Sequence, residues 1–145
     1  MSFTYESPRP MVTVDAVVFR KNGSNTEVLL IRRGRYPYEG MWALPGGFVD
    51  MEETLEEAIV RELEEETGLK DIKLEQLHAF SEIHRDPRGR NISINFWGIA
   101  DGTNTKVTGG DDAADAQWFP INKMPELAFD HKKVVELALS KILFK

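Results

Sequence analysis

Cysteine is absent from the 145 residues of the chain. The protein therefore cannot build a disulfide framework, use a thiolate nucleophile or bind zinc through sulfur. No apolar run approaches the roughly 18 residues that a membrane-spanning helix needs, and the first ten residues contain no apolar segment of the kind found in signal peptides. We expect a cytoplasmic protein without a membrane partner.

Positive charge is also scarce, because 18 lysines and arginines face 24 aspartates and glutamates, for a formal net charge of −6. This balance argues against a protein that binds nucleic acid through bulk electrostatic attraction. The content of hydrophobic residues, 41%, is ordinary for a globular protein. A chain of this length predicts one domain, residues 1–145, with a core of its own.

A glutamate-rich helix follows a pair of glycines near the middle of the chain. Asp50 is a suitable N-cap, and Glu53 stands three residues later, where a capping box places its acid. Gly68 suits the left-handed position that ends many helices. The sequence therefore predicts a helix of about 17 residues between Asp50 and Gly68.

Two of the glutamates in this helix lie where apolar residues are expected. At roughly 100° per residue, one face carries an apolar stripe made of Leu55, Ala58, Ile59 and Leu63. Glu62 and Glu66, four residues apart, fall within this stripe. An exposed acidic helix would explain the other glutamates but not these two, because carboxylates that face a core lose hydration and repel one another.

A bound cation resolves this conflict most simply. The single arginine of the helix, Arg61, cannot neutralise so many acids, and oxygen ligands favour Mg²⁺ or Mn²⁺. Magnesium is commonly shared between carboxylates and the phosphates of a substrate. Gly46 and Gly47, just before the helix, would allow the backbone to approach an anion or to turn a carbonyl toward the metal.

The spacing of these residues resembles a known motif. Five residues separate Gly47 from Glu53, seven separate Glu53 from Arg61, and residues 62–69 read Glu-Leu-Glu-Glu-Glu-Thr-Gly-Leu. This pattern is similar to the Nudix box of the Nudix hydrolases at each of its fixed positions. The resemblance implies hydrolysis of a nucleoside diphosphate linked to another group.

The same resemblance implies roles for individual residues. The metal ligands would be Glu62 and Glu66, joined by Glu65 and by the backbone carbonyl of Gly46. Arg61 would orient the glutamates, and Glu53 would support the junction between loop and helix. The general base varies among Nudix hydrolases; the candidates in this chain are Glu65, Asp111 and Asp112.

The remaining elements predict an α/β fold. Residues 11–19, 27–31, 72–83, 92–99 and 116–120 have the composition of strands. The first two form a hairpin with a rather long loop. An amphipathic helix is expected from His131 to about Leu143, with Asp130 as its N-cap. This order agrees with the Nudix-type α/β/α sandwich with a mixed sheet that the motif implies.

Three arginines outside the helix are candidates for substrate binding. Arg33 ends a predicted strand shortly before the glycines, and guanidinium groups pair well with phosphate oxygens. Arg85 and Arg88 flank Pro87 in a predicted turn, where anchoring of a substrate and stabilisation of the turn are equally good explanations. Taken singly, Arg33 fits a surface residue better, and it is the cluster of Arg32, Arg33 and Arg35 that favours binding of an anion.

The substrate is inferred from resemblance only. Residues 84–89, 110–113 and 127–131 resemble the ADP-ribose pyrophosphatase branch, so we expect a small-molecule nucleotide, ADP-ribose, to be hydrolysed to AMP and ribose 5-phosphate. Two alternatives stay open. The chain could hydrolyse oxidised nucleoside triphosphates, or it could be a non-catalytic sensor of ADP-ribose or another nucleotide. The resemblance also suggests a homodimer.

Overall fold

The computed structural model describes residues 2–102, 105–110 and 113–143. Its centre is a seven-stranded sheet in which β3, β2, β1, β6 and β5 follow one another, while β4 also pairs with β1 and β7 with β2. The strands are β1 (Met11–Asn22), β2 (Asn25–Arg33), β3 (Trp42–Ala43), β4 (Gly46–Phe48), β5 (Glu75–Phe80), β6 (Asn91–Ile99) and β7 (Ala113–Pro120). Strands β1 and β6 pair in parallel, whereas the pairs β1–β2, β1–β4, β2–β3, β2–β7 and β5–β6 are antiparallel, so the sheet is mixed.

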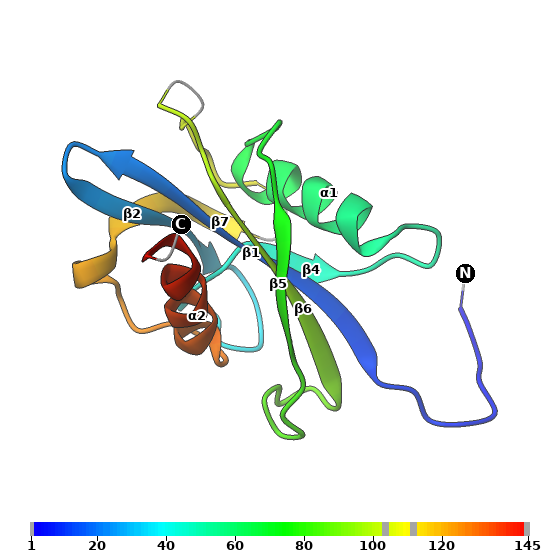
Figure 1. Ribbon diagram of the computed structural model, residues 1–145. Coiled ribbons are helices and arrows are strands. Elements are labelled where there is room, and N and C mark those ends of the chain that lie inside the picture. Colours follow the sequence, from blue (N-terminus) through cyan, green and yellow to red (C-terminus); the bar gives the residue numbers. More distant parts are fainter. Residues whose placement is uncertain (1, 103–104, 111–112, 144–145) are drawn as a thin grey trace.

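Two helices cover opposite faces of this sheet (Figure 1). Helix α1 (Leu55–Thr67) packs on one face, and α2 (His131–Leu143) packs on the other, while η1 (Ile121–Lys123) is a single 3₁₀ turn. The alternation along β1 explains both layers. Val14, Ala16 and Val18 join the core beneath α1, and Val17 and Phe19 join the core beneath α2. The predicted α/β/α sandwich is thus confirmed.

The hairpin between β1 and β2 is tighter than predicted. Asn22 pairs with Asn25, which leaves a turn of two residues in place of a long loop, and Gly23 adopts a positive φ of 65° there. Two-residue turns of this kind match the twist of the flanking strands. Both strands therefore extend several residues beyond their predicted ends.

The start of helix α1 differs from the prediction. Thr54, not Asp50, is the N-cap: its side chain accepts a hydrogen bond from the backbone of Glu57, whose own carboxylate accepts one from the Thr54 backbone. The helix consequently has 13 residues in place of about 17. Gly68 ends it with a φ of 79°, as predicted.

Strand β1 is the axis that positions the site. Its second half pairs with β2, and its first half pairs with β4, so β3 and β4 fill the space where β1 and β2 diverge. The sequence did not predict these two short strands. Pro45, just before these glycines, is held as well, because its carbonyl accepts a hydrogen bond from the backbone N–H of Ala16. This arrangement places Gly46 and Gly47 between α1 and the start of α2.

Two other boundaries differ. The predicted strand at 72–83 is shorter in the structure, where β5 contains residues Glu75–Phe80, and β7 begins three residues earlier than expected, at Ala113. Helix α2 has the predicted bounds. Within the described part of the chain, no helix is both long enough and apolar enough to cross a bilayer.

Candidate active site

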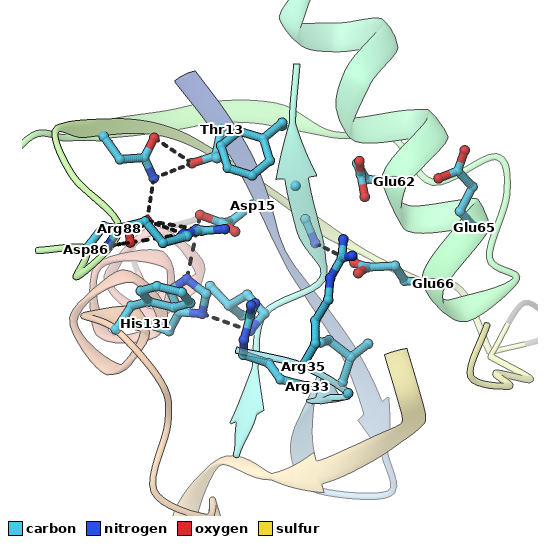
Figure 2. A pocket seen from close by; sticks show the side chains of 18 of the residues that line it. Thr13, Asp15, Arg33, Arg35, Glu62, Glu65, Glu66, Asp86, Arg88 and His131 are labelled. Atoms are coloured by element: carbon cyan, nitrogen blue, oxygen red, sulfur yellow. Dashed lines mark hydrogen bonds and ion pairs between the residues drawn. The ribbon is translucent and has the colours of Figure 1, made fainter. Parts of the chain in front are cut away.

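A cavity of about 220 Å³ opens where β1 and β4 meet the two helices (Figure 2). It gathers side chains from segments that are distant in sequence. Nine of the predicted site residues line it: Arg33, Gly46, Gly47, Arg61, Glu62, Glu65, Glu66, Arg85 and Arg88. Glu53 does not line the cavity and reaches it only through Arg61. The candidate bases Asp111 and Asp112 lie outside the described residues.

The two glycines are required by close packing. A Cβ atom at Gly46 would stand 2.1 Å from the carbonyl oxygen of Val14, and one at Gly47 would stand 2.6 Å from Oε1 of Glu62. Side chains at these positions would therefore collide with the backbone of β1 and with a carboxylate of α1. Glycine lets β4 pass between the central strand and the acidic face of the helix.

Glu66 is a buried carboxylate on the face predicted for it. Only 6% of the residue is exposed, and its Oε1 accepts a hydrogen bond of 2.7 Å from the backbone N–H of Gly46. Burial is the main reason why the pKa of Glu66 rises to about 8, and the nearby carboxylates of Glu62 and Asp15 raise it further. The Gly46 hydrogen bond and Arg33 act in the opposite direction without cancelling this shift. The site therefore holds more negative charge than its surroundings compensate.

Arg61 connects β4, the strand that contains Gly46 and Gly47 and is called the glycine strand below, to the acidic helix α1. Its Nε and Nη2 donate to both carboxylate oxygens of Glu53 at 3.0 and 2.6 Å, and Nη2 also donates to the backbone carbonyl of Phe48. Its Nη1 donates to Glu62 at 2.9 Å and to Glu65 at 3.3 Å. The hydrogen bond with Glu53 raises the pKa of Arg61 most, and Glu62 raises it further.

Glu53 holds the loop end of this arrangement. Its Oε1 accepts a 2.8 Å hydrogen bond from the backbone of Asp50, and the hydrogen bonds from Arg61 lower its pKa. The contacts of Arg61 and Glu53 are compatible with the roles expected of them, which stay predictions. Glu53 was expected to take part in the capping box of the helix; in the structure it connects the loop at Asp50 to Arg61.

The residues present fit a hard divalent cation. Glu62 and Glu66 are both buried, and in Figure 2 both lie beside the glycine strand, whereas Glu65 is more exposed. The side chains that could bind the cation all offer oxygen atoms, the ligand type that Mg²⁺ and Mn²⁺ prefer. Among the described residues, however, no three acidic or histidine side chains are already gathered as a metal-binding group. Arg61 and the Gly46 N–H engage these carboxylates instead.

The three other predicted arginines have different surroundings. Arg33 is half-buried, and its Nε donates to the carbonyl of Pro37 at 2.5 Å; burial and the charge of Arg88 lower its pKa. Arg85 is almost completely buried and makes a two-pronged ion pair with Asp130, at 2.9 and 2.6 Å. This pair fixes the turn against the start of α2, so two nitrogens of the Arg85 guanidinium serve the fold.

Arg88 is held by a neighbour that the sequence did not single out. Both oxygens of Asp86 accept hydrogen bonds from the Arg88 guanidinium, the shortest at 2.8 Å, and the Arg88 backbone N–H donates to the same carboxylate. Burial alone would raise the pKa of Asp86, but the Arg88 hydrogen bonds keep it below its ordinary value. Asp86 therefore fixes the orientation of Arg88 at the cavity wall.

A second set of polar residues was also missed. Asp15 accepts a short hydrogen bond from the hydroxyl of Ser93, which in turn accepts one from Asn95 at 3.1 Å. His131 lies on the other side of Asp15, with Nε2 3.7 Å from the carboxylate, and its Nδ1 accepts the backbone N–H of Leu44 at 3.0 Å. Burial lowers the pKa of His131, so the neutral ring supports the loop before the glycines.

Comparisons with known proteins agree with this geometry. A family model for the NUDIX domain matches residues 9–138. The chain is 46% identical to an ADP-ribose pyrophosphatase from Methanocaldococcus jannaschii over 127 residues, which cover 88% of this chain and 72% of that protein. It is 32% identical to an ADPR responsive transcriptional repressor, NtrR, from Acinetobacter baylyi, over 93% of this chain and 55% of the repressor.

A solved structure is similar over nearly the whole chain. The NUDIX domain of Shewanella oneidensis NrtR, crystallised in complex with ADP ribose, superimposes with a TM-score of 0.86 at 32% identity. The match covers 94% of this chain and 90% of that domain. The relatives thus include one protein named for hydrolysis of ADP-ribose and one named for transcriptional repression.

Proposed function

The chain belongs to the NUDIX family and is a pyrophosphohydrolase of that family, and on this premise we propose that it hydrolyses ADP-ribose with Mg²⁺ as its cofactor. Water adds to one phosphorus atom and the bridging P–O bond breaks, which yields AMP and ribose 5-phosphate. The observation that carries the proposal is the buried carboxylate of Glu66, with its raised pKa, beside Gly46.

In this proposal, the acids of α1 and the glycine strand form the reacting end of the cavity. Glu62, Glu66 and the Gly46 carbonyl, with Glu65, would hold the cation. When bound, Mg²⁺ would neutralise charge on the pyrophosphate and lower the pKa of a water molecule. Arg61 keeps Glu62 in place through their 2.9 Å hydrogen bond.

The proton of the attacking water needs an acceptor. Among the described residues our candidate is Glu65, which lines the cavity and has 39% of its side chain exposed. Asp112 stays the second candidate. Arg33 and Arg88, which line the cavity too, would contact the substrate away from the acids.

The proposal is tested by incubating the purified protein with ADP-ribose and following AMP and ribose 5-phosphate by chromatography. We expect release of both products in equal amounts with Mg²⁺, and none with EDTA. Glu66→Gln should lower turnover 100-fold or more, the loss typical of an electrostatic group in a site. Glu64→Gln, an exposed neighbour on the same helix, is the matched control and should keep full activity.

A second candidate function follows from the similarity to the ADPR responsive repressor. As a sensor, the protein would bind ADP-ribose tightly and release no AMP in the presence of Mg²⁺. Calorimetric binding of ADP-ribose, measured beside turnover, separates the two functions. Turnover of 8-oxo-dGTP in preference to ADP-ribose would instead favour a hydrolase of oxidised nucleotides.

The proposal also covers the localisation, the oligomeric state and the partners of the protein. We propose a cytoplasmic homodimer whose partner is a small nucleotide and not nucleic acid or a membrane. The net charge of −6 supports the part that concerns nucleic acid. Light scattering after size-exclusion chromatography would test the dimer: a mass near the 16.5 kDa of one chain would contradict it.

A further inference from the structure

Two aromatic rings and a guanidinium group form one wall of the cavity. The central carbon of the Arg88 guanidinium lies 4.9 Å from the centre of the Phe48 ring and 5.6 Å from that of Phe129. The Arg33 guanidinium lies over the same Phe129 ring, at 5.1 Å. We refer to Phe48, Arg88 and Phe129 as the aromatic wall. In Figure 2, Arg88 lies on the side of the cavity opposite Glu62, Glu65 and Glu66.

The wall presents flat faces more than hydrogen-bonding edges. Two nitrogens of Arg88, Nε and Nη2, already donate to Asp86, so this edge of the guanidinium is engaged. The polar residues behind it are engaged with one another. Nδ2 of Asn91 donates to Thr13 and to Asp86, both at 3.1 Å. A group that binds here by hydrogen bonds would have to displace these contacts or use Nη1, the remaining nitrogen of the guanidinium.

The backbone of Phe129 indicates that its ring is held in place at a cost. Its φ of 54° lies in the left-handed region, which bulky residues rarely adopt. The residues on both sides enforce it: the Ala128 N–H donates to the carbonyl of Trp42, and Asp130 forms the ion pair with Arg85. Strained backbone of this kind persists where the surroundings over-determine it, and it is concentrated at binding sites.

Phe48 is more exposed than a phenylalanine that packs in the core. It ends β4, immediately after the two glycines, and 42% of it is accessible while it lines the cavity. Aromatic rings that stay accessible in a pocket are suited to stacking against a planar ligand. The guanidinium of Arg88 offers a further planar face of the same kind.

We propose that the aromatic wall is the subsite for the purine base of the substrate. The inference rests on the proposed function, because it assigns one end of ADP-ribose to one end of the cavity. The adenine is planar and aromatic and matches the faces of the wall. The terminal ribose is a polyol that needs several hydrogen-bond partners, whereas the wall offers mainly the faces of planar groups. The pyrophosphate then reaches from the wall toward the acids of α1.

The test compares the two products as ligands of the intact protein, so that it does not depend on turnover. Dissociation constants of AMP and of ribose 5-phosphate are measured by calorimetry for the unaltered protein and for Phe48→Leu and Phe129→Leu. Phe48→Leu keeps an apolar side chain at an exposed position, so folding is not at risk even if Phe129→Leu is unstable. Phe3→Leu, on the exposed N-terminal segment, is the matched control.

We expect Phe48→Leu to weaken AMP binding by roughly five- to tenfold or more, the range of stacking between a base and an aromatic ring, with ribose 5-phosphate unaffected. The control should change neither constant. The inference is wrong if AMP binds equally well to Phe48→Leu, if ribose 5-phosphate loses affinity instead or equally, or if the unaltered protein does not bind AMP. A protein that shows the expected pattern but does not hydrolyse ADP-ribose would keep the subsite and lose the proposed reaction.

Discussion

Replacing Glu66 by glutamine should make the metal-free protein more stable while it destroys the proposed activity. The carboxylate is buried, and its pKa is raised to about 8 from an ordinary value of 4.5. Between these two pH values the folded protein binds a proton more tightly than the unfolded chain. Folding stability should therefore fall as the pH rises through this window, and it should stay low above pH 8.

The size of the effect follows from the same shift. One pKa unit corresponds to about 1.4 kcal/mol, so the ionisation of Glu66 opposes folding by roughly 3 kcal/mol at pH 7 and by about 5 kcal/mol above pH 8. Glutamine has no charge to lose, and its oxygen can still accept the Gly46 hydrogen bond. The variant should thus gain stability over the unaltered protein as the pH rises from 5 to 8.5.

Urea unfolding in EDTA at several pH values, followed by tryptophan fluorescence, measures this difference. Glu64→Gln is again the control, because Glu64 is exposed and its substitution should leave the pH dependence unchanged. Mg²⁺ should narrow this difference in stability, since an ion that binds only the folded state stabilises it, by about 2.7 kcal/mol at 100 times its dissociation constant. Its binding near pH 7 should also release a proton.

Two results would refute the reasoning. If Glu66→Gln and the unaltered protein lose stability in parallel from pH 5 to 8.5, burial does not disturb the ionisation of Glu66. If Mg²⁺ stabilises both proteins equally, this carboxylate does not contribute to the metal site. The first result would remove the observation on which the proposed function depends, and the second would remove Glu66 from the proposed metal site.

Three further substitutions test how the site is held together. Arg61→Lys cannot bridge several acids at once and should lower turnover or Mg²⁺ affinity roughly 10- to 100-fold, measured by Mg²⁺ titration of the activity. Arg85→Met leaves the carboxylate of Asp130 buried without its partner and should cost about 3–5 kcal/mol of unfolding free energy, much of which Asp130→Leu in the same chain should restore. His131→Ala leaves the N–H of Leu44 without an acceptor and should cost about 1–3 kcal/mol, whereas His131→Asn should lose less; urea unfolding measures both.

Local patterns in the sequence were sufficient to orient the acidic helix. The burial of Glu62 and Glu66 follows from helical periodicity alone and was predicted correctly. The start of the helix was not, because two capping patterns stand four residues apart. Asp50 and Thr54 are each followed by an acid after three residues. In the structure Glu53 accepts hydrogen bonds from both the Asp50 backbone and Arg61, and Thr54 caps the helix.

Contacts between distant segments were beyond such patterns. Asp15 and Ser93 are 78 positions apart and meet only because β1 and β6 pair in parallel. The sequence did contain a signal. Asp15 interrupts an apolar run in the first strand, and Ser93 and Asn95, two residues apart, interrupt another in the strand at 92–99. Buried polar groups need partners, so such interruptions indicate a polar network. They do not reveal that His131, from another layer, completes it.

The glycine strand is held from two sides, and this explains how the protein holds carboxylates that repel one another close together. Beneath it, the start of α2 fixes the preceding loop: His131 accepts the N–H of Leu44, and the Ala128 N–H donates to Trp42. Above it, Glu66 accepts the N–H of Gly46. Because both helices anchor one short strand, the carboxylates cannot relieve their repulsion by moving apart.

A site built in this way is unfavourable without a cation, and a cation that bound there would compete with Arg61 and the Gly46 N–H for the two carboxylates. Preorganised charge of this kind lowers the cost of stabilising an ionic reaction, and the loss of folding stability is the expected counterpart at a functional site. Selection for stability alone would favour glutamine at position 66. In the proposed function, the presence of glutamate there is explained by the ion that it would bind, and not by the fold that it weakens.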